Sequence, residues 1–149
     1  MRRFIRCRSC HRHLSAPLAR EIQSAETNHA DGAAFVPAGG LHVSDGEFFT
    51  ATEGRYVINL ADRRNLTVHT DLKRIAGCCG LDGCDGANQL CTCGVEAATE
   101  KSDCWMPHAL IFDLMRSNWS RMPANSALQR AAASVASLPR APAAECQYR

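Results

Sequence analysis

Gly77-Cys-Cys-Gly-Leu-Asp-Gly-Cys84 begins the stretch of sequence that decides the fold, which continues through Cys91-Thr-Cys-Gly94 to Cys104. Six of the nine cysteines of the 149-residue chain lie in this stretch, with five glycines and few large apolar side chains. Cysteines that serve only as small buried residues do not fit a segment so rich in glycine and aspartate. The stretch therefore predicts bound metal, because thiolates are preferred ligands of zinc.

The other cysteines are Cys7, Cys10 and Cys146. Cys7-x2-Cys10 has the spacing with which a single turn offers two thiolates to one ion. An odd number of cysteines, and a basic N-terminus with no apolar run after it, argue against an extracellular disulfide framework. We therefore expect a reducing, cytoplasmic environment. No apolar run of about 18 residues occurs, so no membrane-spanning segment is expected.

The candidate ligands can be grouped in several ways, and zinc is the expected metal, with two ions. The 67 residues between the two cysteine groups are no obstacle, because the cost of closing a loop grows only logarithmically with its length. Two all-cysteine sites are one scheme, and a single zinc with spare thiols is another. An iron–sulfur cluster is a rival to zinc. The candidate ligands are Cys7, Cys10, Cys78, Cys79, Cys84, Cys91, Cys93, Cys104 and His108.

Two local features complicate the grouping. His108 would share a helical face with Cys104, which allows a site made of Cys91, Cys93, Cys104 and His108. Neighbouring side chains of an extended chain point in opposite directions, so the simplest interpretation sends Cys78 and Cys79 to different ions. The glycines on either side of this pair would nevertheless permit a turn that brings both sulfurs to one ion.

The rest of the chain predicts a small α+β domain. Residues 48–50, 55–60 and 66–70 have strand character and suggest a small antiparallel β meander. Residues 95–99 are a further candidate strand, which would leave the turn at Cys91–Gly94. Residues 108–116 fit either a strand or a short helix, and 14–22 fit a turn or a short helix. We expect one zinc-stabilised domain over residues 1–122, with a β insertion at 41–72 between the cysteine groups. Residues 123–149 are rich in alanine and are expected to form a mobile tail.

Charge is distributed unevenly along the chain. The net charge is only +2, but residues 1–20 carry +6, residues 21–113 carry −8 and residues 114–149 carry +4. Arg2, Arg3, Arg6, Arg8 and Arg12 surround the first cysteine pair and raise the possibility of nucleic-acid binding. The acidic cysteine-rich segment disfavours it, because it would repel phosphate. Another protein is therefore the expected partner, with Trp105 and Trp119 as candidate anchor residues, although core packing is the favoured role for Trp105.

The sequence contains no recognisable catalytic motif. The zinc-deaminase pattern is absent, and so are the His-Glu-x-x-His helix, the Gly-x-Ser-x-Gly elbow and the Walker A loop. Asp82 and Asp85 are better explained as turn formers than as a catalytic pair. We therefore expect a non-catalytic structural zinc module. A thiolate-based redox or metal-handling protein is an alternative, suggested by the crowding of Cys78, Cys79 and Cys84.

Residues 77–88 and Cys91-Thr-Cys-Gly-Val-Glu96, followed by Ser102-Asp-Cys-Trp105, carry a resemblance. The chain resembles a group of uncharacterised cysteine-rich bacterial proteins, and this resemblance implies metal binding. The Cys91-x-Cys93-Gly94 turn also looks like the knuckle of zinc-ribbon and treble-clef modules. Its spacing is one residue shorter than their usual Cys-x2-Cys.

Overall fold

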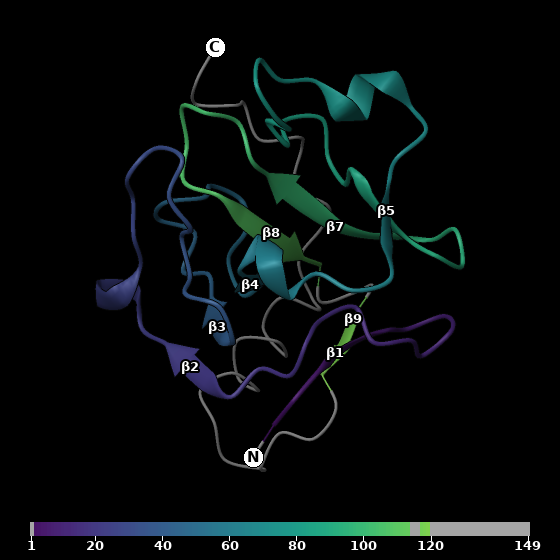
Figure 1. Ribbon diagram of the computed structural model, residues 1–149, viewed down its shortest axis with the longest axis horizontal. Helices are drawn as coiled ribbons and strands as arrows, with labels where there is room; N and C mark the ends of the chain where they lie inside the picture. The colour runs from purple at the N-terminus through teal and green to yellow at the C-terminus, as the bar shows by residue number, and fades with distance from the viewer. Residues whose placement is uncertain (1, 114–116, 120–149) are drawn as a thin grey trace.

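The computed structural model describes residues 2–113 and 117–119. These residues form a seven-stranded sheet, a separate two-stranded sheet and short 3-10 helices (Figure 1). The strands are β1 (Ile5–Cys7), β2 (Arg20–Ile22), β3 (Gly40–Val43), β4 (Tyr56–Ile58), β5 (Leu66–Val68), β6 (Gln89–Cys91), β7 (Glu96–Lys101), β8 (Ala109–Phe112) and β9 (Ser117–Trp119). The 3-10 helices are η1 (Ser24–Glu26), η2 (Leu60–Asp62) and η3 (Leu72–Ile75). Within the described ranges, no helix has the length and apolar character needed to cross a membrane.

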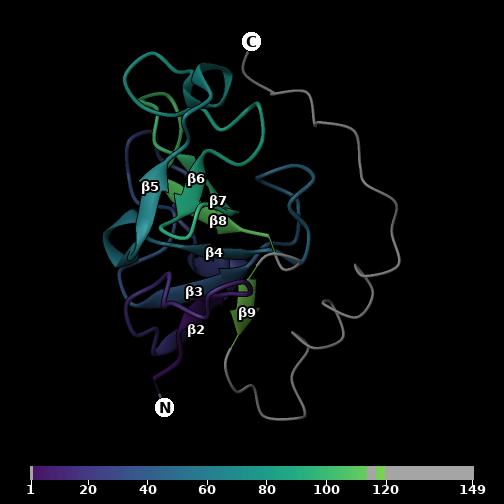
Figure 2. The same cartoon turned by 90° about the vertical axis from the view of Figure 1, so that its right-hand side faces the viewer.

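The large sheet is mixed, with the strand order β2-β3-β4-β8-β7-β6-β5, and Figure 2 shows these strands stacked from β5 to β2. β2 and β3 run parallel, and the other neighbours in this sheet are antiparallel. Because β4 pairs with β8 and β5 with β6, the order differs from a simple meander. Strands from before and after the cysteine-rich loop therefore belong to one sheet.

The centre of the sheet is buried on both faces. All residues of β4 and β8 are buried, which explains why their sequences are continuous apolar runs rather than alternating ones. Side chains of a strand alternate between faces, so Tyr56 and Ile58 enter one core cluster while Val57 enters the other. The β structure dominates the described residues, and the helical part of the expected α+β fold is confined to 3-10 turns.

Residues outside the central strands complete each core cluster. Ile5, Leu14 and Leu18 from the N-terminal segment pack in the cluster that contains Tyr56. Phe35 and Phe49 pack in the other, with ring centroids 4.7 Å apart. The N-terminal segment, which carries the first cysteine pair, is thus anchored to the sheet by its own apolar residues.

Several expected elements are found and others differ. β4 and β5 lie within segments predicted as strands, β7 begins within the predicted segment 95–99 and extends to Lys101, and β8 selects the strand alternative for 108–116. Residues 48–50 form bends and a turn instead of a strand. Phe49 is buried in the core cluster that contains Phe35 and Val57. The 14–22 segment ends in β2 and contains no helix. The tail expected at 123–149 lies outside the described residues.

Candidate metal centres

Two turns far apart in the sequence bring four cysteines together. Cys7 ends β1 and Cys10 follows it, while Cys91 ends β6 and Cys93 lies in the β6–β7 hairpin. Their sulfur atoms all lie within 4.8 Å of one another. The sulfurs of Cys7 and Cys93 are 3.7 Å apart, and those of Cys10 and Cys91 are 3.5 Å apart. We call this group the four-cysteine cluster.

The backbone shapes both turns so that the sulfurs converge. In the first turn, His11 donates its N–H to the Cys7 carbonyl at 2.9 Å and adopts a left-handed conformation with φ of 60°. In the second, Gly94 donates its N–H to the Cys91 carbonyl at 2.7 Å and has φ of 94°, which favours glycine. The Arg12 guanidinium donates to the Thr92 hydroxyl at 2.8 Å and links the two turns directly.

The sulfur separations of the four-cysteine cluster are compatible with a closed tetrahedral site. Four thiolates about 2.3 Å from a zinc ion lie about 3.8 Å from one another, close to the observed sulfur separations. Cys7 and Cys91 are buried and belong to the main core cluster. Burial raises the pKa of Cys91 to about 12, whereas the Val95 N–H lowers the pKa of Cys93 to about 7. A cation at the centre would stabilise the thiolate form of all four.

A second group, the three-cysteine cluster, consists of Cys78, Cys79 and Cys104. Their sulfurs also lie within 4.8 Å of one another, and those of Cys78 and Cys79 are 3.8 Å apart. All three side chains are exposed. The expectation that Cys78 and Cys79 reach different ions therefore differs from the structure, which places both sulfurs in one group.

Asp103 explains how two adjacent cysteines face the same way. Its carboxylate, only 1% exposed, accepts the N–H groups of Cys78 at 2.7 Å, Cys79 at 2.9 Å and Cys104 at 2.8 Å. Burial raises the pKa of Asp103, but these three N–H groups and a hydrogen bond from Trp105 outweigh it and hold the pKa well below its usual value. Asp103 was not among the predicted site residues, and its only signal was its place between Ser102 and Cys104.

Two glycines make this turn possible. Gly77 has φ of 150°, and a Cβ on it would come within 1.9 Å of the Gly80 carbonyl oxygen. A Cβ on Gly80 would come within 2.2 Å of the Ser102 carbonyl oxygen. The loop thus packs backbone against backbone beside Asp103, and no other residue type fits at either position without a shift.

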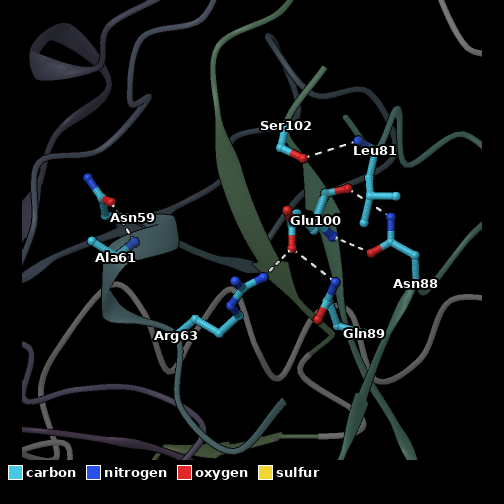
Figure 3. Close-up of polar contacts among 8 residues, drawn as sticks. All are labelled: Asn59, Ala61, Arg63, Leu81, Asn88, Gln89, Glu100 and Ser102. Atoms are coloured by element: carbon cyan, nitrogen blue, oxygen red, sulfur yellow. Dashed lines mark hydrogen bonds and ion pairs between the residues drawn. The ribbon is translucent and has the colours of Figure 1, made fainter. Parts of the chain in front are cut away.

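Buried polar side chains fix the two strands that connect the clusters (Figure 3). The Asn88 side-chain amide donates to the Glu100 carbonyl at 2.8 Å and accepts the Glu100 N–H at 2.7 Å. These side-chain contacts take the place of backbone pairing beside the irregular register between β6 and β7. The Glu100 carboxylate accepts from Gln89 at 2.9 Å and Arg63 at 2.7 Å. The Ser102 hydroxyl accepts the Leu81 N–H at 3.1 Å, which ties the cysteine-rich loop to the end of β7.

The clusters lie at opposite ends of β7, since Cys93 precedes this strand and Cys104 follows it. Seven of the nine predicted ligands fall into these clusters, and Cys84 and His108 fall into neither. Cys84 is disulfide-bonded. His108 is half-buried beside Ala34, and its Nε2 has no hydrogen-bond partner among the described residues. Asp82 accepts the Cys84 N–H at 2.9 Å, as expected of a turn former.

No family model, curated protein or solved structure matches this chain. Both cysteine clusters could hold metal ions. They differ in ligand number and burial, with four thiols that are partly buried in one and three exposed thiols in the other.

Proposed function

We propose that this protein is a non-catalytic module, stabilised by structural zinc at the four-cysteine cluster, that acts by binding another protein. The observation that carries the zinc assignment is the convergence of Cys7 and Cys10 with Cys91 and Cys93, at sulfur separations that suit tetrahedral coordination. Four thiolates fill the coordination sphere of zinc and leave no position for a substrate, which favours a structural role over a catalytic one.

The energetic argument also favours a structural ion. A zinc ion at this cluster would tie the N-terminal segment to the β6–β7 hairpin, across more than 80 residues of chain. Structural zinc contributes about 10–16 kcal/mol of apparent binding free energy. This equals or exceeds the total stability of a typical domain, which is about 5–15 kcal/mol. The short strands therefore gain from the ion what extended apolar packing would otherwise provide.

The test is the metal content and thermal stability of single variants. Cys10→Ser and Cys93→Ser change partly exposed members of the cluster, and Cys84→Ser/Cys146→Ser, which leaves all seven cysteines of the two clusters in place, is the matched control. We expect the first two to lose one zinc per chain and to melt at a much lower temperature, while the control keeps its zinc content. Full zinc content and an unchanged melting temperature in Cys10→Ser and Cys93→Ser would refute the proposal.

A protein partner is supported by the exposed edge of the sheet. β5 is an edge strand, and Val68 and Leu72 beside it are 49% and 77% exposed. An edge strand offers unpaired backbone groups to a strand of a partner, and exposed apolar side chains add contact area.

The test is a pull-down with the zinc-loaded protein as bait. A partner protein that the parent captures should no longer be captured by the Val68→Lys/Leu72→Lys variant, and should still be captured by Thr50→Lys, which changes an exposed residue away from this edge. The captured protein, once purified, should bind directly with the same dependence; binding unaffected by the double substitution would exclude this edge.

A further inference from the structure

We propose that the three-cysteine cluster is a second zinc site with an open coordination position, which takes an external thiolate or imidazole donor and exchanges its ion with the solution. The inference concerns Cys78, Cys79 and Cys104, and it does not depend on the structural role of the four-cysteine cluster. Because the two clusters share no ligand, variants of each can fail or succeed separately.

The three-cysteine cluster is held in a costly conformation for which packing gives no reason. Adjacent side chains of an extended chain point to opposite sides, yet the sulfurs of Cys78 and Cys79 are 3.8 Å apart. The turn requires a glycine at position 77 with φ of 150° and a buried carboxylate, Asp103, that accepts three amide N–H groups. The exposed thiols bury no apolar surface in return, so the arrangement is explained by a ligand common to them.

The sulfur separation in the three-cysteine cluster also fits zinc. The separation of 3.8 Å between two of the sulfurs equals the distance of about 3.8 Å expected between thiolates on a tetrahedral zinc ion. Asp103 acts as the outer support that orients the ligands, as hydrogen-bonded carboxylates commonly do around metal sites. Its oxygens are already engaged with the amide groups of the three cysteines, and it lies outside the ligand group.

The three-cysteine cluster supplies three of the four ligands that a tetrahedral zinc ion takes. Within the part of the chain that the structure describes, no other cysteine, histidine or carboxylate joins the group. Cys84, the nearest predicted candidate in sequence, is disulfide-bonded. Three protein ligands with one exchangeable position are typical of zinc sites that bind external molecules, whereas structural sites have four. Since thiolates and imidazole are the donors that zinc accepts most readily, one of these is expected in the open position.

Burial indicates that the two ions would exchange at different rates. A chelator removes zinc by first binding to it, which requires an accessible coordination position. The three-cysteine cluster is exposed at each ligand, whereas Cys7 and Cys91 of the other cluster are buried. The exposed ion should therefore leave first, and it should leave without loss of the fold.

The experiment uses the full chain with Cys84→Ser and Cys146→Ser, so that the seven cysteines of the two clusters are the only thiols. Zinc transfer to the coloured chelator pyridylazoresorcinol is followed over time. We expect two phases, each of one zinc per chain, and loss of the fast phase alone in Cys104→Ser or Cys78→Ser. A single phase, one zinc per chain in the parent, or a fast phase that survives both substitutions would overturn the proposal.

Cobalt tests the open position itself. Co²⁺ replaces the fast ion of the same protein, and imidazole or 2-mercaptoethanol is then added. We expect the visible cobalt bands to shift with either ligand. Bands that do not shift would contradict the open coordination position.

The unmodified chain is the comparison for Cys84. If the bands shift in the Cys84→Ser protein and not in the unmodified chain, Cys84 is the fourth ligand and the site is closed. Because Cys10→Ser affects the other cluster, loss of its zinc with the fast phase intact would separate this proposal from the structural one.

Discussion

The carboxylate of Asp103 is almost fully buried and accepts three backbone N–H groups, one from each cysteine of the three-cysteine cluster. Such a carboxylate replaces water around the amide groups and fixes the direction of the cysteine side chains that follow from them. Hydrogen bonds to a charged acceptor are stronger than those between neutral groups, at about 1.5–3 kcal/mol each. The position of the three thiols thus depends on one charge that does not itself reach the ion.

Asp103→Asn tests this dependence. The substitution removes the charge and directs an NH2 group at one of the amides, so the turn loses its support. We expect metal affinity of the three-cysteine cluster to fall about 10–100-fold, as for other residues that orient metal ligands. Competition with a chelator of known affinity measures it. Asp85→Asn, at an exposed position of the same loop, is the control. Equal affinities in the two variants would mean that Asp103 does not position the thiols.

Cys93 and Cys91 predict the pH dependence of zinc uptake by the four-cysteine cluster. A pKa of about 7 leaves Cys93 partly ionised in the metal-free protein at neutral pH, whereas a pKa of about 12 keeps Cys91 protonated. Zinc binds thiolates and displaces protons, so affinity falls as the pH falls. We expect the rate of zinc uptake to rise with an inflection near pH 7 as Cys93 ionises, measured by stopped flow with a zinc indicator. A thiolate titration of the metal-free protein, followed by ultraviolet absorbance, should show the same inflection and lose it in Cys93→Ser; its persistence there would assign it to another group.

At the scale of elements, the β6–β7 pair connects the two clusters. Its register shifts next to Gln89, and a buried asparagine takes over the hydrogen bonds that the interrupted ladder leaves open. The hairpin turn at one end carries Cys93, and the segment after β7 carries Cys104. The stiffness of this pair therefore sets the position of ligands in both clusters.

Asn88→Ala should destabilise the whole domain. The side chain is fully buried, and its removal leaves the N–H and carbonyl of Glu100 without partners. Burying unsatisfied groups of this kind costs about 3 kcal/mol in total. Chemical denaturation of the zinc-loaded protein measures the change in unfolding free energy. Asn28→Ala, which removes an exposed side-chain contact to Ala30, is the control and should cost far less. A similar loss in both variants would contradict the role given to Asn88.

The elements also show what the sequence could predict. β4 and β5 were predictable from their apolar and β-branched residues, because strand propensity is local. Their partners were not, since the pairing of Tyr56 with Phe112 joins segments more than 50 residues apart. In the same way the residue types identified the metal ligands, while the turn that unites Cys78 and Cys79 depends on Asp103, which lies 24 residues from Cys79. Long-range backbone contacts of this kind leave no periodic pattern in the sequence.

At the scale of the molecule, the chain combines a small sheet with two cysteine clusters at opposite ends of one strand. The apolar core lies on both faces of β4 and β8, away from the glycine-rich loop. In the functional proposals above, one ion holds the N-terminal segment on the sheet, and the other sits on an exposed loop. The ion that stabilises the fold and the ion that exchanges with the solution would thus lie at opposite ends of β7.

The basic N-terminal segment is the feature of this chain that favours binding to nucleic acid. Arg2, Arg8 and Arg12 have exposed side chains. Against them, residues 21–113 carry −8, and zinc bound by four thiolates adds two further negative charges beside the first cysteine turn. Binding to phosphate backbones weakens steeply with salt, so a true interaction is strongest at low ionic strength. We expect no binding of random duplex or single-stranded DNA in fluorescence anisotropy at about 50 mM salt. Binding that weakens with added salt and is lost in Arg8→Glu/Arg12→Glu would contradict the proposal of a protein partner and favour a nucleic acid. Such a result would show that the N-terminal arginines outweigh the negative charge of residues 21–113.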